Sequence, residues 1–396
     1  MTAGKRPSFA TLAVRAGQRI DPATGAHSTP IYQTSTYQLQ SVEFGGRLTE
    51  SGTARDSYSR AGNPTVRAAE EKLAALENAE AAVAFGSGMG AIAGVFLSHL
   101  RPGDEVLTLG PVYSDTHTLL TTLLAEYGVA SRRVEPHELA TAVAPNTKLV
   151  YVETPGNPTL SIVDLAAVAA TARRLGVLTV ADNTFSSPFI TRPLELGIDM
   201  VVHSATKYLG GHGDLLAGFA AGSSELMAPV RMTGLRLIGA SLDPLAAFLL
   251  LRGMRTLHLR VAAHSANAAA IAEALLGAPG VSRVLYPGLP QHPGHDVARR
   301  QMSAFGGMVS LDFASGRAGA KAFIERLIVF DHAVSLGDVM SLACVSSTTT
   351  HVGLTPQQRA RDGISDGLVR LSVGVEDEAD LVADVLQAAE AAALSA

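Results

Sequence analysis

The chain has a single cysteine, Cys344, among its 396 residues, which excludes an intramolecular disulfide and a zinc cluster built from cysteines. Charged residues make up only 17%, and 31 Lys and Arg against 36 Asp and Glu leave a formal net charge of -5. This balance lacks the basic footprint of a nucleic-acid-binding protein. No uninterrupted apolar run approaches the roughly 18 residues that span a bilayer, so we expect a cytoplasmic protein without membrane segment or signal peptide.

Three regions of the chain differ in their sequence pattern. Residues 1–62 are rich in Thr, Ser, Gln, Gly and Arg and lack helical periodicity, which predicts an extended arm. Residues 63–255 alternate short apolar runs with helical segments, a pattern typical of a parallel sheet covered by helices. Residues 256–396 begin with an alanine-rich helix and continue with shorter strands, which indicates a smaller α+β domain. The predicted strands are 81–85, 105–109, 148–153, 178–181, 200–202, 307–313 and 368–373, and the predicted helices are one from 63 onward, 90–100, 116–127, 165–175 and 261–276.

A glycine-rich loop follows the first predicted strand. The segment Gly86–Ala91 enters a helix, so its backbone N–H groups and the helix dipole suit a phosphate. The same residues satisfy a dinucleotide-binding fingerprint, with Asp104 and Glu105 downstream, and this keeps a nicotinamide-dependent oxidoreductase open as an alternative. A tight turn needed only for strand-to-helix packing is the structural alternative.

Two later strand ends favour a different cofactor. Asp182 and Lys207 each follow an apolar strand, and the lysine lies beside the hydroxyl groups of Ser204 and Thr206. A desolvated lysine has a lowered pKa and a free amine, which suits Schiff-base chemistry with pyridoxal phosphate (PLP). Asp182 would keep the PLP ring nitrogen protonated, while Ser87 and the two hydroxyl groups bind its phosphate. The alternative is a surface ion pair for the lysine and a helix cap for Asp182.

A series of motifs in this order resembles the transsulfuration, or Cys/Met-metabolism, family of PLP-dependent enzymes. The resemblance covers nearly the whole chain and implies an α/β fold of the aminotransferase type I class. It also implies a homotetramer, built as a dimer of dimers with shared active sites. Segments 363–377, 333–338 and 286–288 are most similar to methionine γ-lyases. The motifs are Tyr58–Thr65, Ser87–Ala91, Glu153–Pro158, Asp182–Phe185, Ser204–His212, Ser335–Gly337 and Arg370–Gly374.

The resemblance implies a role for individual residues. Lys207 would carry the cofactor and move protons, and Tyr113 would stack on the cofactor ring and act as an acid. Tyr58 and Arg60 would reach from the arm into the phosphate site of the neighbouring subunit, where a guanidinium suits a phosphate. Arg370 would bind the substrate α-carboxylate. The other implied cofactor positions are Ser87, Gly88, Met89, Asp182, Ser204 and Thr206, and the other implied substrate positions are Asn157, which also lies beside the phenolic oxygen of PLP, Ser335, Asp115 and Met340.

The implied reaction is γ-elimination from a small sulfur amino acid, which for methionine gives methanethiol, 2-oxobutanoate and ammonia. Cystathionine γ-lyase is the first alternative, and O-acylhomoserine sulfhydrylase or cystathionine γ-synthase is less favoured. Thr118 and Met340 stand where cystathionine enzymes commonly carry an arginine and a glutamate. Without these charges the distal head of cystathionine would stay unpaired, at a cost in binding. A family member that binds PLP without turnover is a further alternative.

Two features depart from the expected pattern, and one further segment carries metal-ligand residue types. Asp115 stands where methionine γ-lyases typically have a cysteine, and its carboxylate is able to meet a substrate amine. The segment Val345-Ser346-Ser347 replaces the usual His-Pro-Ala near the substrate. His292 and His295 are metal-ligand types, but the Pro and Gly between them favour a solvated loop, and we expect no metal.

Overall fold

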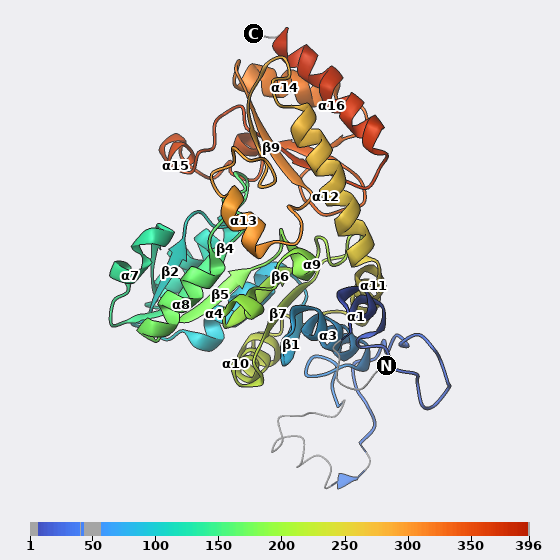
Figure 1. Cartoon of the computed structure of the whole chain (residues 1–396). Helices are drawn as coiled ribbons and strands as arrows, with labels where there is room; N and C mark the ends of the chain where they lie inside the picture. Colours follow the sequence, from blue (N-terminus) through green and yellow to red (C-terminus); the bar gives the residue numbers. More distant parts are fainter. Residues whose placement is uncertain (1–6, 40, 43–56, 395–396) are drawn as a thin grey trace.

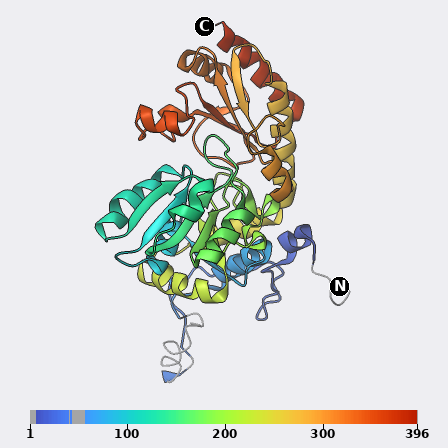
Figure 2. The same cartoon turned by 60° about the vertical axis from the view of Figure 1, so that its left-hand side comes forward.

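A computed structural model describes residues 7–39, 41–42 and 57–394 (Figure 1). Residues 1–6, 40 and 43–56, which belong to the predicted arm, and residues 395–396 lie outside that description. The described chain forms a seven-stranded sheet and a five-stranded sheet. Figures 1 and 2 show the helix α12 (Leu257–Ala274) running from the first sheet along the second. The predicted domain division between residues 255 and 256 falls just before this helix and stays a prediction.

The first sheet is mostly parallel, as the sequence predicts. Its strand order is β1-β7-β6-β5-β4-β2-β3, and only β7 runs antiparallel to its two neighbours. Two of its strands were not predicted. β3 has a largely exposed Ala-Ser-Arg-Arg-Val sequence, and β7 reads Gly-Phe-Ala-Ala-Gly, which lacks the branched residues favoured in strands. The strands are β1 (Ala81–Phe85), β2 (Glu105–Leu109), β3 (Ala130–Val134), β4 (Thr147–Glu153), β5 (Leu178–Asp182), β6 (Met200–Ser204) and β7 (Gly218–Gly222).

Helices cover both faces of this sheet. Leu149 and Tyr151 of β4 belong to the hydrophobic cluster that includes α4 (Gly88–His99), and the intervening Val150 and Val152 belong to the cluster that includes α8 (Leu165–Leu175). Side chains that alternate between two buried faces explain why the strands are apolar throughout. Helix α3 (Pro64–Glu77) packs against β1 and β7.

Side-chain caps set where these helices begin. The Asn63 side chain accepts hydrogen bonds from the backbone N–H groups of Thr65 and Val66, and Pro64 opens α3. Ser87 caps α4 through Gly90, so this helix starts two residues before the predicted position 90. The predicted helix at 165–175 is confirmed. The helix predicted at 116–127 is divided into α5 (Ser114–Thr118), a π-helical turn (Leu119–Leu123) and α6 (Leu124–Glu126).

The second sheet has the strand order β10-β11-β12-β9-β8, and α12, α14 and α16 pack together beside it. Cys344 is buried on β11, as expected for a small apolar side chain. The strands are β8 (Val281–Leu285), β9 (Met308–Phe313), β10 (Asp331–His332), β11 (Leu342–Val345) and β12 (Val369–Ser372). The remaining helices are α7 (Leu139–Ala142), α9 (Ser187–Ile190), α10 (Ser224–Pro229), α11 (Pro244–Arg255), α13 (His295–Gln301), α14 (Arg317–Arg326), α15 (Pro356–Arg361) and α16 (Glu378–Ala393).

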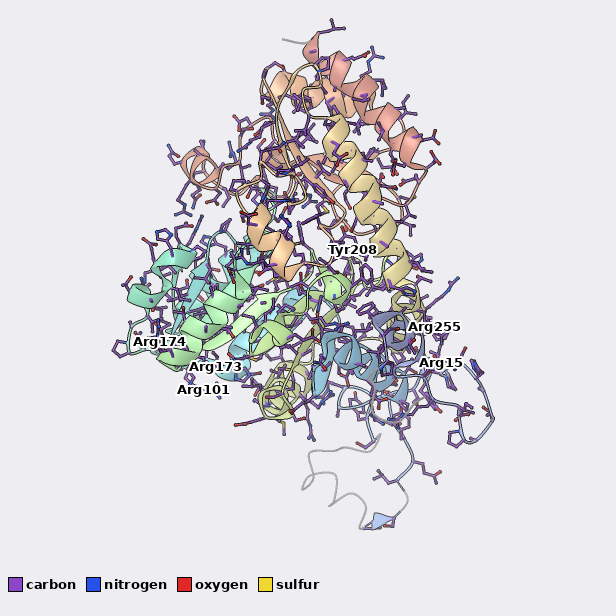
Figure 3. The ribbon with its side chains drawn as sticks, in the orientation of Figure 1. Arg15, Arg101, Arg173, Arg174, Tyr208 and Arg255 are labelled. Carbon is purple, nitrogen blue, oxygen red and sulfur yellow. The ribbon has the colours of Figure 1, made fainter. Side chains whose placement is uncertain are left out.

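The arm is not extended throughout. Helix α1 spans Phe9–Arg15, so the prediction of an arm without helix is wrong at this point. The buried Lys72 of α3 explains the helix end, because its Nζ donates a hydrogen bond to the carbonyl oxygen of Ala13 at 2.6 Å. Burial and the nearby Arg255 lower the pKa of Lys72 to about 8. Figure 3 shows Arg15 and Arg255 on the same side of the molecule.

The structure bears on the expected absence of a membrane segment and of a metal site. Over the described ranges, no helix is both long and apolar enough to cross a membrane. His292 is buried, and its Nδ1 accepts the N–H of Gly294 at 3.1 Å, so the prediction of a solvated loop is wrong for this residue. No group of three or more potential metal ligands forms within the part of the chain that the structure describes.

Candidate active site

A cavity of about 790 Å³ lies at the carboxyl ends of β2, β4, β5 and β6, where an open α/β sheet places its ligands. Residues from the second half of the chain close the other side. Tyr208 lies where these two parts meet (Figure 3) and packs edge-on to His264 of α12, with 5.3 Å between ring centroids. The cavity brings together most of the site residues predicted from the sequence: Ser87, Gly88, Met89, Tyr113, Asp115, Asn157, Asp182, Ser204, Thr206, Lys207, Ser335 and Arg370.

Three predicted residues do not line the cavity of their own chain. Tyr58 is 44% exposed, and the guanidinium of Arg60 lies over its ring, 5.4 Å from the centroid. Arg60 also donates a hydrogen bond to the carbonyl oxygen of Arg236. Met340 is 53% exposed and lies outside the cavity. The predicted roles of these residues stay predictions.

Lys207 follows β6 and projects into the cavity. Its Nζ donates a hydrogen bond to the hydroxyl oxygen of Ser335 at 2.7 Å. Burial, with a further contribution from the positive charge of Arg370, lowers the pKa of Lys207 to about 8. Ser335 has a φ of 95°, a strained conformation for a residue with a side chain, and such strain gathers at functional positions. With this pKa a fraction of the Lys207 amine is neutral and nucleophilic near neutral pH, unlike an ordinary lysine.

Asp182 ends β5 and lies directly opposite Glu153, its register partner on β4. Its carboxylate accepts hydrogen bonds from the backbone N–H of Thr184 at 2.9 Å and from the Tyr151 hydroxyl at 3.1 Å. Burial, followed by the charge of Asp182, raises the pKa of Glu153 well above its usual range. The raised pKa favours the neutral form of Glu153 beside Asp182. A fixed carboxylate of this kind stabilises a protonated ring nitrogen.

The N-terminus of α4 forms the anion-binding end of the cavity. The backbone N–H groups of Gly88 and Met89 donate to no acceptor among the residues that the structure describes. A Cβ atom on Gly88 would lie 2.7 Å from the Cβ of Ser204, so the absence of a side chain lets Ser204 approach the helix end. Ser87 uses its oxygen as the helix cap, which leaves its hydroxyl proton free to donate. The hydroxyl of Thr206 donates to the carbonyl oxygen of Ala217 at 3.3 Å and accepts the backbone N–H of Ala217 at 3.0 Å. These groups fit the phosphate of PLP.

Arg370, on β12, is only 3% exposed. Its Nη1 donates to the side-chain oxygen of Asn157 and its Nη2 to the carbonyl oxygen of Ser335, both at 2.9 Å. Its Nε is buried without a partner, and no carboxylate of the described residues lies within ion-pair distance of it. A buried guanidinium that is held in place and lacks a counter-ion is ready to bind a carboxylate.

Tyr113 is held at both of its ends. Its backbone N–H donates to the two oxygens of Glu153, both at 2.9 Å, and its hydroxyl donates to Oδ2 of Asp115 at 2.9 Å. Burial, with the hydrogen bond and charge of Asp115, raises the pKa of Tyr113 to about 12. Tyr113 is therefore protonated at neutral pH, while Lys207 is partly neutral. This separation suits Tyr113 to the role of an acid and Lys207 to the role of a base.

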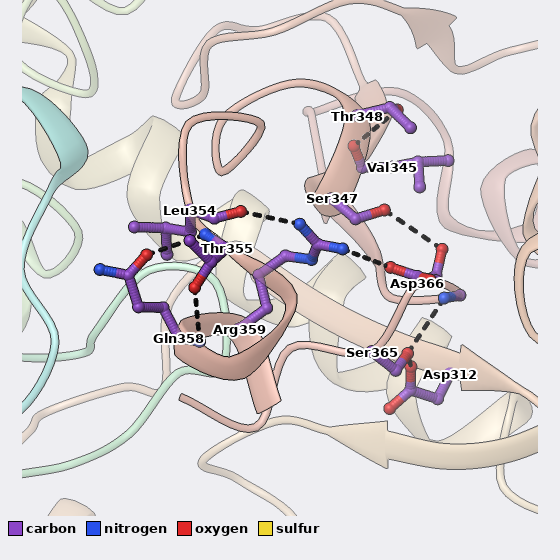
Figure 4. Close-up of polar contacts among 11 residues, drawn as sticks. Asp312, Val345, Ser347, Thr348, Leu354, Thr355, Gln358, Arg359, Ser365 and Asp366 are labelled. Carbon is purple, nitrogen blue, oxygen red and sulfur yellow. Dashed lines mark hydrogen bonds and ion pairs between the residues drawn. The ribbon is translucent and has the colours of Figure 1, made fainter. Parts of the chain in front are cut away.

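The segment that follows β11 supplies another wall of the cavity. The departure at Val345-Ser346-Ser347 ends this strand and opens a short turn that does not itself line the cavity. Arg359 holds the segment by donating to the carbonyl oxygen of Leu354 and to Asp366, each at 2.9 Å (Figure 4). This segment contributes four residues to the cavity lining, namely Thr349, Thr350, Val352 and Gly353.

Several residues of the site are not predicted by the sequence pattern. Glu153 carried a usable signal, because it ends a strand next to the strand that ends at Asp182. Tyr151 and Thr184 hydrogen bond to Asp182, but a hydroxyl within or after a strand does not reveal its partner from sequence alone. The placement of Thr349 and Val352 in the cavity wall depends on how the second half of the chain folds back over the first, which the local sequence does not reveal.

The chain is similar to known enzymes over nearly its whole length. The family model described as Cys/Met metabolism PLP-dependent enzyme matches residues 10–390. The L-methionine gamma-lyase of Pseudomonas putida is 45% identical over 393 residues, which cover 98% of this chain and 99% of the relative. The O-succinylhomoserine sulfhydrylase of Pseudomonas aeruginosa is 43% identical over 381 residues, covering 96% of this chain and 94% of the relative.

A solved structure shows the same fold. The cystathionine gamma synthase of Xanthomonas oryzae pv. oryzae, in complex with aminoacrylate and cysteine, superimposes with a TM-score of 0.93 at 39% identity, covering 99% of this chain and 100% of that one. The expected type I fold is thereby confirmed. Because the family match spans nearly the whole chain and the cavity fits PLP, this chain belongs to the PLP-dependent enzymes of Cys/Met metabolism.

Proposed function

We propose that the protein is a methionine γ-lyase, which cleaves the bond between Cγ and sulfur of L-methionine. The products are methanethiol, 2-oxobutanoate and ammonia. The observation that supports methionine over cystathionine is the charge of the cavity wall. Lys207 and Arg370 are the cationic groups among its described lining residues, and Thr118 is neutral. A substrate with a second carboxylate would therefore find no cation left to pair with it.

The cavity residues have separable roles toward PLP and the substrate in this proposal. PLP, when bound, supplies a ring that withdraws electrons from the substrate α-carbon. Ser87, Ser204, Thr206 and the N-terminus of α4 would hold its phosphate, and Asp182 would hold its ring nitrogen. Arg370 binds the α-carboxylate of the amino acid and thereby fixes the direction of the α C–H bond.

Proton movements belong to two residues of the chain. Lys207, with its lowered pKa, would take the proton from Cα, pass it to the bound cofactor and so recover its neutral amine, and then take a proton from Cβ. Tyr113, with its raised pKa, keeps its proton until the bond between Cγ and sulfur breaks and then donates it to the departing sulfur. The sulfur leaves as a neutral thiol, and hydrolysis releases the four-carbon skeleton as 2-oxobutanoate together with ammonia.

Product analysis tests this proposal directly. We expect PLP-loaded protein to form methanethiol and 2-oxobutanoate in equal amounts from methionine, and faster than it cleaves cystathionine, because the cavity lacks a partner for the distal carboxylate. Both products are quantified in parallel reactions at equal substrate concentration. Brisk cystathionine cleavage with little turnover of methionine would replace the proposal with a cystathionine γ-lyase.

A second proposal concerns the neighbouring subunit. We propose a homotetramer, built as a dimer of dimers, in which Tyr58 and Arg60 complete the phosphate site of the partner. Both residues are exposed in this chain, and neither lines its own cavity, which supports a role in trans.

Subunit mixing tests the shared site. Lys207→Ala and Arg60→Ala subunits are each expected to be nearly inactive when pure. Mixed dimers contain one site with both native residues, so mixing is expected to restore up to about a quarter of the native activity, given random exchange and two-fold pairing. Activity after unfolding and co-refolding the two variants is the measurement. No recovery, with mixed dimers confirmed by mass, would contradict the crossing of the arm.

A further inference from the structure

The carboxylate of Asp115 is the feature of the cavity that the proposed reaction does not use. Asp115 lies in the first turn of α5, lines the cavity and is exposed. The other two acidic residues of the lining are engaged. Asp182 accepts two hydrogen bonds, and Glu153 is buried, accepts the backbone N–H of Tyr113 and has a raised pKa. Asp115 is thus the cavity carboxylate that remains open to a ligand.

The hydrogen bonds of Asp115 leave part of this carboxylate unpaired. Oδ2 accepts the hydroxyl of Tyr113, while Oδ1 has no partner among the described residues. None of the lysine, arginine or histidine side chains in the described part of the chain lies within ion-pair distance of it. Arg370 and Lys207, the cations of the cavity, form their hydrogen bonds with Asn157 and Ser335 and not with Asp115.

The cavity therefore offers a substrate one positively charged and one negatively charged position. Arg370 is set to bind the α-carboxylate at one position. Asp115 lies on the wall that Tyr113, Ser114 and Thr118 also form. Because Tyr113 donates its proton to the departing sulfur in the proposed reaction, a carboxylate hydrogen-bonded to Tyr113 lies on the leaving-group side of the substrate.

We propose that the protein also cleaves γ-substituted amino acids whose leaving thiol carries a protonated nitrogen, and that Asp115 is the residue that selects them. This inference rests on the proposed γ-elimination. A leaving group that ends in an ammonium pairs with Asp115, and the charge-assisted hydrogen bond replaces the water lost on entry. A neutral leaving group leaves the carboxylate desolvated without a counter-ion, and a leaving group that ends in a carboxylate is repelled.

The reaction balances for a simple member of this class. In S-(2-aminoethyl)-L-homocysteine the bond between Cγ and sulfur breaks, and the sulfur takes a proton to leave as 2-aminoethanethiol. One water enters, and 2-oxobutanoate and ammonia form from the remaining skeleton. S-propyl-L-homocysteine has the same shape with a methyl group in place of the ammonium. The two substrates therefore differ mainly in the charge that Asp115 would meet.

The experiment compares kcat/KM for this pair in PLP-loaded protein. We expect the native protein to prefer the aminoethyl substrate by about tenfold or more, as a hydrogen bond to a charged group predicts. Asp115→Asn is expected to remove or reverse this preference. Any effect of the substitution on Tyr113 alters the turnover of both substrates alike. The ratio of their kcat/KM values therefore isolates the effect of the charge of Asp115. The matched control is Glu126→Gln, an exposed acid on the neighbouring α6, which should leave the ratio unchanged.

Binding supplies a readout that does not depend on turnover. L-lysine and L-norleucine have no γ-leaving group and differ by the terminal ammonium, so their dissociation constants for the loaded protein are measured by calorimetry. We expect tighter binding of lysine by the native protein and loss of that advantage in Asp115→Asn. A native protein that prefers the neutral member of both pairs would overturn the inference. Methionine turnover is assayed separately, so failure of the proposed main activity is distinguished from failure at Asp115.

Discussion

Lys207→Ala is expected to lower the turnover of every sulfur amino acid by about 10⁴-fold or more, because it removes the base and the covalent attachment point of the cofactor together. The amine of Lys207 lies 2.7 Å from the hydroxyl oxygen of Ser335 and opens onto the cavity that also holds Asp182. No other lysine is among the described residues that line this cavity. No second lysine of the described lining is therefore available as the base or as the attachment point of the cofactor.

The first measurement is the position of the cofactor after reduction. Borohydride treatment of loaded native protein should fix PLP to the peptide that contains Lys207, as detected by mass spectrometry after digestion. Lys72 is the internal control, because burial lowers the pKa of Lys72 to about 8 as well. Its amine donates to the carbonyl oxygen of Ala13 and lies outside the cavity, so its peptide should stay unlabelled. Labelling at Lys72 with none at Lys207 would overturn the assignment.

The second measurement is the pH dependence of cofactor capture by the apoprotein. Attack on an aldehyde needs the neutral amine, and burial with the charge of Arg370 lowers the pKa of Lys207 to about 8. Below that pH the amine is protonated and unreactive, and above it the neutral form predominates. The rate of capture should therefore rise as pH increases through about 8, instead of rising near the value of 10.5 for an ordinary lysine.

Much of the site was predictable because its residues follow strands. The sequence places Asp182 directly after an apolar run and Lys207 within a few residues of the next one, and parallel strands bring their carboxyl ends to one edge. The glycine loop before α4 is a similar local signal, and here the structure adds the reason for Gly88, whose Cβ would collide with Ser204. Local sequence was thus sufficient where the fold itself gathers the residues.

Contacts between distant segments were not predictable in the same way. The raised pKa of Glu153 depends on its burial and on its register with Asp182, and the hydrogen bond from Lys207 to Ser335 spans 128 positions of the sequence. Helix α1 was missed because seven residues are too few for a clear helical period, and its end is set by Lys72 in another helix. Strand β7 was missed because burial against α4, not the composition of Gly218–Gly222, holds it in the sheet.

Arg370→Ala is expected to lower kcat/KM for methionine by about 10³-fold, since two or more hydrogen bonds to a charged carboxylate are lost together. The guanidinium is held by Asn157 and the carbonyl oxygen of Ser335 before substrate arrives, so little ordering is needed on binding. KM should rise and kcat should fall, because the same contact binds the amino acid and aligns its α C–H bond. Arg370→Lys should recover only part of the loss, because an ammonium cannot form the forked pairing.

A general loss of folding would give the same kinetic result, and the charge of Arg370 provides the measurement that separates the two. Its positive charge contributes to the lowered pKa of Lys207, so Arg370→Ala should raise that pKa and move cofactor capture by the apoprotein to higher pH. Arg174→Ala, an exposed arginine on α8, should leave both the kinetics and this pH dependence unchanged. If Arg370→Ala captures PLP with the native pH dependence but binds methionine poorly, Arg370 binds the α-carboxylate and its charge does not set the pKa of Lys207. Native binding of methionine by Arg370→Ala would place the α-carboxylate elsewhere in the cavity.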